Sequence, residues 1–138
     1  MPLPAPDDSF FVYADDDADD LEFVVSSFAN HAKELEACTF FSGPSAYNFL
    51  LELQTAGRKP CLIILDINMP GMSGKELLSI LRTLPFFDDV PIILFTTSNL
   101  EEDASFAFRH KAGFLTKPVG LAQMEVVAEQ FLSFCSKE

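Results

Sequence analysis

Short apolar runs alternate with longer segments of helical period along most of the chain. The runs occupy residues 10–13, 37–41, 61–65, 92–95 and 113–116. Between them, apolar residues recur three or four positions apart, as they do along one face of a helix. The pattern predicts five repeats of a strand followed by a helix.

The segments after the runs carry signals for helix ends. Asp19 and Asp20 stand at the start of the first segment, where acidic side chains suit the positive end of a helix dipole. Gly57 is placed to close the second helix, because glycine adopts the left-handed conformation common there. We expect the fourth helix over about residues 101–111. The last helix is marked by apolar residues from Met124 to Leu132.

The third run, from Cys61 to Leu65, is apolar without interruption. A strand of this kind is covered on both faces, as in a parallel sheet flanked by helices. Alternating strands and helices therefore predict an α/β fold with a five-stranded parallel sheet in the flavodoxin-like order 2-1-3-4-5 and five helices on both faces. Ligands of such folds bind beyond the carboxyl ends of the strands.

Polar residues follow four of the five runs at that edge of the sheet. They are Asp15 and Asp16, Asp66, Thr96 and Lys117. Three converging carboxylates repel one another, so the site needs positive charge. A cluster of oxygen ligands without histidine or cysteine favours a hard divalent cation, Mg²⁺ above all.

These groups match the needs of phosphoryl transfer, which depends mainly on positioning and on stabilising negative charge. A carboxylate can act as the nucleophile, the metal and Lys117 can neutralise phosphate charge, and Thr96 can donate a hydrogen bond. A single aspartate after a strand is more often a turn or a helix cap. The joint occurrence at four strand ends therefore carries the hypothesis.

Three sequence motifs also resemble those of a known protein family. The segment from Leu65 to Gly74, the acidic pair and Lys117–Pro118 together resemble the receiver domains of bacterial two-component response regulators. The resemblance runs from about Phe10 to Ser133. It implies that Asp66 is the phosphoacceptor.

The resemblance also implies roles for the residues around Asp66. Asp16 would bind Mg²⁺ directly and Asp15 largely through water, with the backbone carbonyl of Asn68 as a further ligand. Thr96 would hydrogen-bond the phosphoryl group, and Lys117 would form an ion pair with it.

The resemblance assigns roles to two further positions, one in switching and one in the access of water. Phe114 occupies the position of the switch aromatic, although Ala112-Gly113-Phe114 is shorter than the usual pattern. Ser98, like Asn68, stands where side chains tune the access of water. The run of three acids leaves the register open between Asp15–Asp16 and Asp16–Asp17; the first pair lies nearer the strand.

Length and composition favour one domain. The 138 residues fit a flexible segment over 1–8 and a receiver domain over 9–138. A net charge of −12 argues against direct binding of nucleic acid or anionic membranes. Three scattered cysteines predict reduced thiols in the core, and with no signal peptide or membrane span we expect a cytoplasmic protein.

The expected partner is a sensor histidine kinase or a histidine phosphotransfer protein. We expect no output domain after Ser133, so output would come through protein contact or onward phosphotransfer. The family also uses the surface of the fourth helix, fifth strand and fifth helix for partners and homodimers. Two alternatives remain: a docking module that needs no phosphorylation, and an aspartyl-phosphate hydrolase. Asn68 argues against the hydrolase, because it cannot serve as the acid/base that such enzymes carry there.

Overall fold

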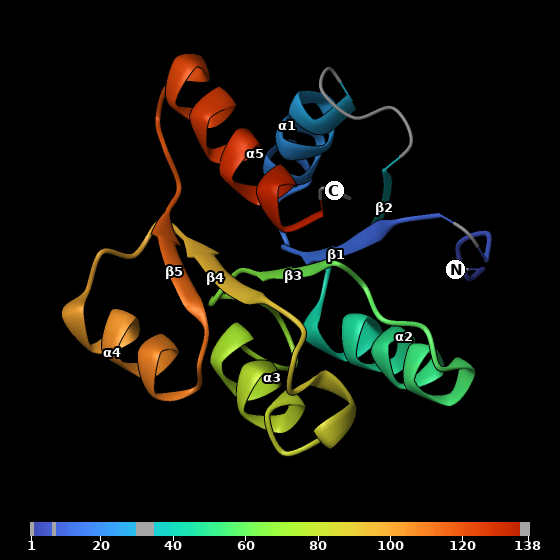
Figure 1. Cartoon of the computed structure of the whole chain (residues 1–138). Helices are drawn as coiled ribbons and strands as arrows, with labels where there is room; N and C mark the ends of the chain where they lie inside the picture. The colour runs from blue at the N-terminus through green and yellow to red at the C-terminus, as the bar shows by residue number, and fades with distance from the viewer. Residues whose placement is uncertain (1, 7, 30–34, 136–138) are drawn as a thin grey trace.

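The structure, a computed structural model, describes residues 2–6, 8–29 and 35–135. Strands and helices alternate along the chain from β1 to α5 (Figure 1). Their bounds are β1 Phe10–Ala14, α1 Ala18–Ala29, β2 Glu36–Phe40, α2 Gly43–Ala56, β3 Leu62–Leu65, α3 Gly74–Leu81, the 3-10 helix η1 Pro85–Phe87, β4 Ile92–Thr96, α4 Glu101–Arg109, β5 Gly113–Thr116 and α5 Leu121–Cys135.

The strands form one parallel sheet in the order β2-β1-β3-β4-β5, which confirms the predicted fold class. Helices α1 and α5 cover one face of the sheet, and α2, α3 and α4 cover the other (Figure 1). Every residue of β1, β3 and β4 is buried. This burial on both faces explains why these strands are continuously apolar in sequence.

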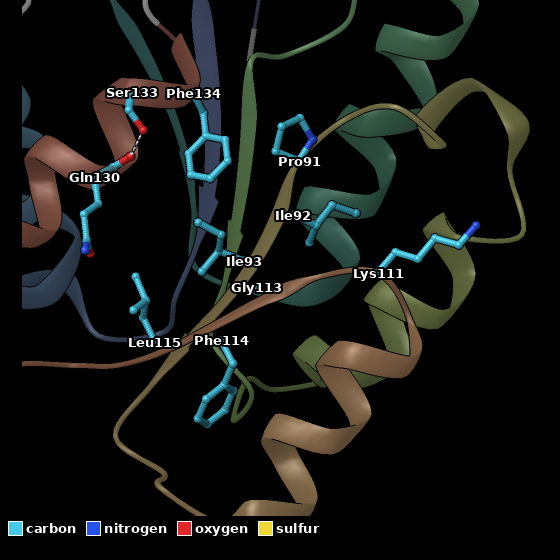
Figure 2. A pocket seen from close by; sticks show the side chains of 10 residues that line it. All are labelled: Pro91, Ile92, Ile93, Lys111, Gly113, Phe114, Leu115, Gln130, Ser133 and Phe134. Carbon is cyan, nitrogen blue, oxygen red and sulfur yellow. Dashed lines mark hydrogen bonds between the residues drawn. The ribbon is translucent and has the colours of Figure 1, made fainter.

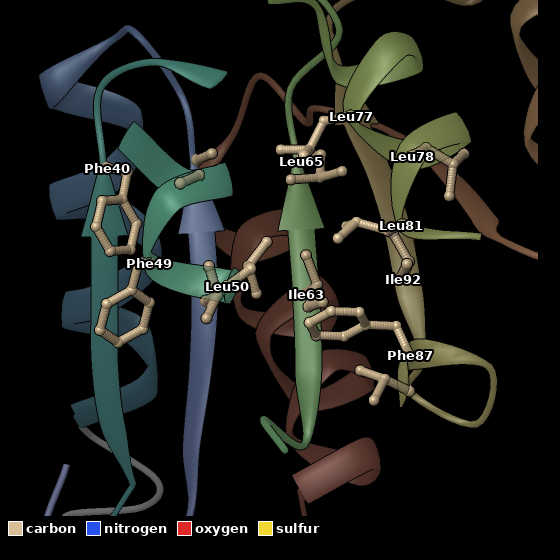
Figure 3. Close-up of a cluster of buried hydrophobic side chains, with 14 of the residues drawn as sticks. Phe40, Phe49, Leu50, Ile63, Leu65, Leu77, Leu78, Leu81, Phe87 and Ile92 are labelled. Carbon is tan, nitrogen blue, oxygen red and sulfur yellow. The ribbon is translucent and has the colours of Figure 1, made fainter. Parts of the chain in front are cut away.

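Two apolar cores result, one on each face of the sheet. Figure 3 shows part of the core beneath α2 and α3, where Phe49 and Leu50 of α2 and Leu77 of α3 meet the sheet. On the opposite face, Phe28 of α1 and Phe131 of α5 pack edge-to-face. Alternate residues of each buried strand point into the two cores, so a single strand holds both layers together.

The ends of the helices follow their local sequence. Gly57 closes α2 in the left-handed conformation (φ 69°), as predicted. Helix α4 ends at Arg109, two residues before the expected end. The segment over 1–8 was expected to be flexible, and this stays a prediction; Arg58 donates hydrogen bonds to the carbonyls of Pro4 and Ala5 in that segment. Within the described residues, no helix combines the length and apolarity needed to cross a membrane.

The cysteines correct one expectation. Cys61 directly precedes β3 and forms a disulfide with Cys135, the last residue of α5. The prediction of reduced cysteines is therefore wrong for this pair, which lies 74 residues apart in sequence and meets only through the fold. Cys38 is a buried free thiol, as expected of core filler, and burial raises its pKa to about 11.

Arg82 joins the end of α3 to two neighbouring turns. Its guanidinium donates to the carbonyls of Phe87 (2.6 Å) and Val90 (3.2 Å) around η1. It also donates to the carbonyls of His110 and Lys111, each at 2.9 Å, beyond the end of α4. Lys111 has a positive φ of 55°, so this turn is one that local preference does not favour.

Replacing Arg82 by methionine is expected to lower the free energy of unfolding by about 2–3 kcal/mol, because four carbonyls lose a charged donor. Urea unfolding monitored by circular dichroism measures the change. The matched control is Arg58→Met, which loses two hydrogen bonds to the N-terminal segment and a cation–π contact with the ring of Phe10, and should cost clearly less. Equal losses in the two variants would contradict this role for Arg82.

Candidate functional site

Backbone hydrogen bonds between neighbouring strands fix the positions of the strand-end residues. The amide of Asp66 donates to the carbonyl of Ala14 at the end of β1 (2.9 Å). The amide of Asp15 donates to Phe40 of β2 (3.0 Å), and that of Lys117 donates to Thr96 of β4 (2.7 Å). The residues that follow β1, β3 and β5 are thus held at one edge of the sheet.

Asp15, Asp16 and Asp66 form a carboxylate cluster at this edge. Their carboxylate oxygens lie within 4.8 Å of one another. Asp15 and Asp66 are buried, and Asp16 is exposed. An all-oxygen donor set with one open side fits a hard divalent cation such as Mg²⁺. Asp17 is otherwise engaged, since its side chain accepts from the amides of Asp19 and Asp20 at the start of α1.

Lys117 lies in the same cluster. Its ammonium nitrogen is 2.6 Å from Asp15, 2.8 Å from Asp20 and 3.3 Å from Asp66, and the side chain is only 8% exposed. Burial alone lowers the pKa of Lys117, but contacts with Asp15, Asp20 and Asp66 outweigh it and raise the pKa above its ordinary value. Lys117 is therefore a permanent positive charge next to Asp66.

Asp66 is a buried carboxyl group with a shifted pKa. Burial and then repulsion by Asp15 raise its pKa to about 6, while Lys117 and a hydrogen bond from Thr96 oppose the rise. Thr96 itself is fully buried at the end of β4. At neutral pH Asp66 is thus ionised but poorly solvated, and such a carboxylate gains from any cation that reaches it.

Two residues of the site were missed by the sequence analysis. Asp20 was assigned only to the helix start, yet it binds Lys117. Tyr13 was counted only in the first apolar run, yet its hydroxyl donates to Asp15 (2.9 Å). Burial, and then the charge of Asp15, raise the pKa of Tyr13, so it stays a neutral donor. No sequence signal identifies either contact, because each depends on the arrangement of side chains at the sheet edge.

The loop between Asp66 and α3 lies close against Asp66. A side chain at Gly74 would collide with the carbonyl oxygen of Asp66, so this position requires glycine. Ser73 and Glu76 form a capping box that starts α3 at the same point. Asn68 lies exposed in this loop.

Ser98 connects the end of β4 to α4. Its hydroxyl donates to the buried carboxylate of Asp103 (2.6 Å), which also forms an ion pair with Lys75 of α3. Lys75 first, and then Ser98, hold the pKa of Asp103 below its ordinary value. Neither Lys75 nor Asp103 was singled out from the sequence. Phe114 of β5 packs against the core under α3 and α4 with its ring half-buried.

A pocket of about 500 Å³ lies away from the carboxylate cluster. It is bordered by the starts of β4 and β5 and by the last turns of α5, where Ser133 and Phe134 line it (Figure 2). Phe114 of β5 is among the residues that line the pocket, and its ring lies on the side of β5 that faces α4 (Figure 2). The residues of the carboxylate cluster do not line this pocket.

Comparisons with known proteins agree with this geometry. Response regulator Rcp1 of Synechocystis sp. is 31% identical over 77 residues, which cover 55% of this chain and 52% of Rcp1. The KDP operon transcriptional regulatory protein KdpE of Escherichia coli is 31% identical over 105 residues, which cover 75% of this chain and 44% of KdpE. The chain thus spans about half the length of these curated relatives.

Solved structures match over more of the chain. The phosphorylated cyanobacterial phytochrome response regulator RcpA superposes with a TM-score of 0.81 at 26% identity, covering 94% of this chain and 97% of RcpA. The Mn²⁺-bound form of Rcp1 superposes with a TM-score of 0.80 at 25% identity, covering 91% and 93%. A family model for the response regulator receiver domain matches residues 11–129. The chain therefore belongs to the response regulator receiver domain family.

Proposed function

We propose that the protein is a signalling receiver that takes a phosphoryl group onto Asp66 in a Mg²⁺-dependent reaction. The observation that carries the proposal is the position of Asp66, a buried and ionised carboxylate that lies beside two further acids and in contact with Lys117. Its pKa of about 6 leaves it a nucleophile at neutral pH. The similarity to RcpA, which has been solved in phosphorylated form, supports the same chemistry.

The reaction moves a phosphoryl group between two nucleophiles. An oxygen of Asp66 attacks phosphorus, the bond from phosphorus to the donor's leaving atom breaks, and an acyl phosphate forms on Asp66. Lys117 then pairs with a phosphoryl oxygen in place of the Asp66 carboxylate that it contacts at 3.3 Å. The hydroxyl of Thr96 donates a hydrogen bond to another phosphoryl oxygen.

The carboxylate cluster would hold the metal. Asp15, Asp16 and Asp66, with the backbone carbonyl of Asn68, are the proposed ligands. Mg²⁺ bound there supplies charge neutralisation for the phosphoryl oxygens. The Mn²⁺-bound form of Rcp1 supports a divalent ion in a similar protein. Tyr13 and the Asp17 amide, which both donate to Asp15, orient this carboxylate for the role.

Membership of the family implies a histidine kinase as the source of the phosphoryl group. A histidine phosphotransfer protein is the other proposed donor. Output would follow when Thr96 moves toward the phosphoryl group and Phe114 turns inward, with Ser98 setting how water reaches the acyl phosphate. The surface of α4, β5 and α5 is the proposed contact for a target or a second copy; Phe108 of α4 is 83% exposed there.

Incubation with acetyl phosphate tests the proposal. We expect intact-mass spectrometry to show one phosphoryl adduct per chain in the presence of Mg²⁺. Excess chelator should reduce the adduct at least tenfold, because the repulsion between the carboxylates and the phosphoryl oxygens is then uncompensated. A folded protein that binds Mg²⁺ and forms no adduct would favour the docking module instead.

A further inference from the structure

The disulfide lies near the amino end of β3, whereas the carboxylate cluster lies at the carboxyl ends of the strands. Cys61 precedes the first residue of β3, whereas Asp66 follows the last. Helix α5 runs back across the sheet, so its last residue, Cys135, returns to the edge where β3 starts (Figure 1). The Cα atoms of the two cysteines are 5.1 Å apart, within the range that a disulfide spans.

Both cysteines are open to exchange with small thiols and disulfides. Each is packed against the core beneath α1 and α5 but remains partly exposed. Cys38, in contrast, is 2% exposed, and burial raises its pKa to about 11. A pair that is partly exposed and adjacent can react with a small disulfide, while the buried thiol stays inert.

We propose that Cys61 and Cys135 form a reversible thiol–disulfide site that locks the end of α5 to the start of β3. The oxidant is a low-molecular-weight disulfide of the glutathione class. One cysteine thiolate attacks this disulfide, expels one thiolate and forms a mixed disulfide. The second cysteine thiolate attacks the protein sulfur, forms the Cys61–Cys135 bond and expels the other thiolate. Two protein thiols thus lose two protons and two electrons, and the small disulfide becomes two thiols.

The lock acts on the last turn of α5. Ser133 and Phe134 directly precede Cys135 and line the pocket beside β4 and β5 (Figure 2). Phe134 is 46% exposed, whereas Leu132 in the same turn packs against the core beneath α1 and α5. With the disulfide present, the turn is tied to the central strand of the sheet. Reduction removes this covalent link, so we expect the wall of the pocket to open more readily.

The disulfide also closes a long loop. Its cysteines are 74 residues apart, and a loop of this length removes much of the conformational freedom of the unfolded chain. Reduction is therefore expected to lower the midpoint of thermal unfolding by roughly 10 °C. This expectation concerns only the two sulfur atoms and does not depend on phosphoryl chemistry at Asp66.

The test equilibrates the protein with reduced or oxidised glutathione, followed by alkylation of free thiols under denaturing conditions and intact-mass analysis. We expect one alkylated thiol per chain in the oxidised sample and three in the reduced one. Proteolytic peptides should show Cys61 linked to Cys135. The Cys38→Ser variant is the matched control and should exchange as the wild type does.

A second readout uses the wild-type protein alone, so no variant has to fold. Amide hydrogen exchange over residues 130–135 should be at least tenfold slower in the oxidised sample, and its thermal midpoint should be higher. Three free thiols after treatment with oxidised glutathione, or stable glutathione adducts on both cysteines, would overturn the proposal. Identical exchange and identical midpoints in the two redox states would overturn it as well.

Discussion

Asp66→Asn is expected to abolish the phosphoryl adduct and at the same time to stabilise the metal-free protein. The amide of asparagine is a poor nucleophile, so the adduct formed with acetyl phosphate and Mg²⁺ should fall at least a hundredfold. The variant also removes a buried charge that Asp15 repels. Greater stability would show that the missing adduct reflects lost chemistry and not a misfolded chain.

The sign of the stability change follows from the pKa of Asp66. Folding raises this pKa from 3.8 to about 6, so the ionised form is less favourable in the folded protein than in the unfolded chain. The wild type is therefore destabilised above about pH 6, and this effect disappears as the pH falls below about 4. Allowing for solvent screening, we expect Asp66→Asn to gain about 1–2 kcal/mol at pH 7.5.

Urea unfolding in excess chelator at pH 7.5 and pH 4 measures the difference. Asp89→Asn is the matched control, because Asp89 lies on the surface and pairs only with the exposed Lys59. It should keep the full adduct. An Asp66→Asn variant that is less stable than the wild type at pH 7.5 would contradict the assignment of Asp66 as a poorly solvated carboxylate that Asp15 repels.

Lys117→Met is expected to have the largest effect on stability. The substitution keeps the length of the side chain but removes the cation that lies within 3.3 Å of Asp15, Asp20 and Asp66. Removing one partner of a buried ion pair leaves an uncompensated charge and costs about 3–5 kcal/mol. We expect a loss of about 3 kcal/mol or more in the free energy of unfolding, measured in chelator at neutral pH.

Divalent metal should recover part of that loss. Mg²⁺ brings positive charge to the same carboxylates, so it should stabilise Lys117→Met more than it stabilises the wild type. Lys59→Met is the control; its ion pair with Asp89 is exposed, and the unfolding curve should barely change. Two results would contradict a stabilising role for the ion pairs of Lys117. One is an equal loss of unfolding free energy in the two lysine variants, and the other is a Lys117→Met protein that Mg²⁺ does not stabilise.

Much of the fold was predictable, because the strands that carry it are buried on both faces. An unbroken apolar run such as Leu62–Leu65 leaves few alternatives to a central parallel strand, and the alternation with helices determines the rest. The strand-end residues Asp15, Asp66 and Lys117 were predictable for the same reason. The edge of a parallel sheet brings together residues that the sequence separates.

Contacts made by side chains from separate elements were not predictable. The ion pair between Lys75 of α3 and Asp103 of α4 depends on how two helices pack, and the ion pair between Asp20 and Lys117 depends on where α1 lies relative to β5. The Cys61–Cys135 bond needs α5 to return to the start of β3. The positions of these residues along the chain do not indicate that their side chains meet.

Trapping the acyl phosphate identifies the residue that accepts the phosphoryl group. Borohydride reduces an aspartyl phosphate to homoserine, and peptide sequencing by mass spectrometry then locates the modified residue. After incubation with acetyl phosphate and Mg²⁺, we expect homoserine at position 66 and nowhere else. Homoserine at Asp15, Asp16 or another acid, or none at all in a protein that carries a phosphoryl adduct, would contradict it.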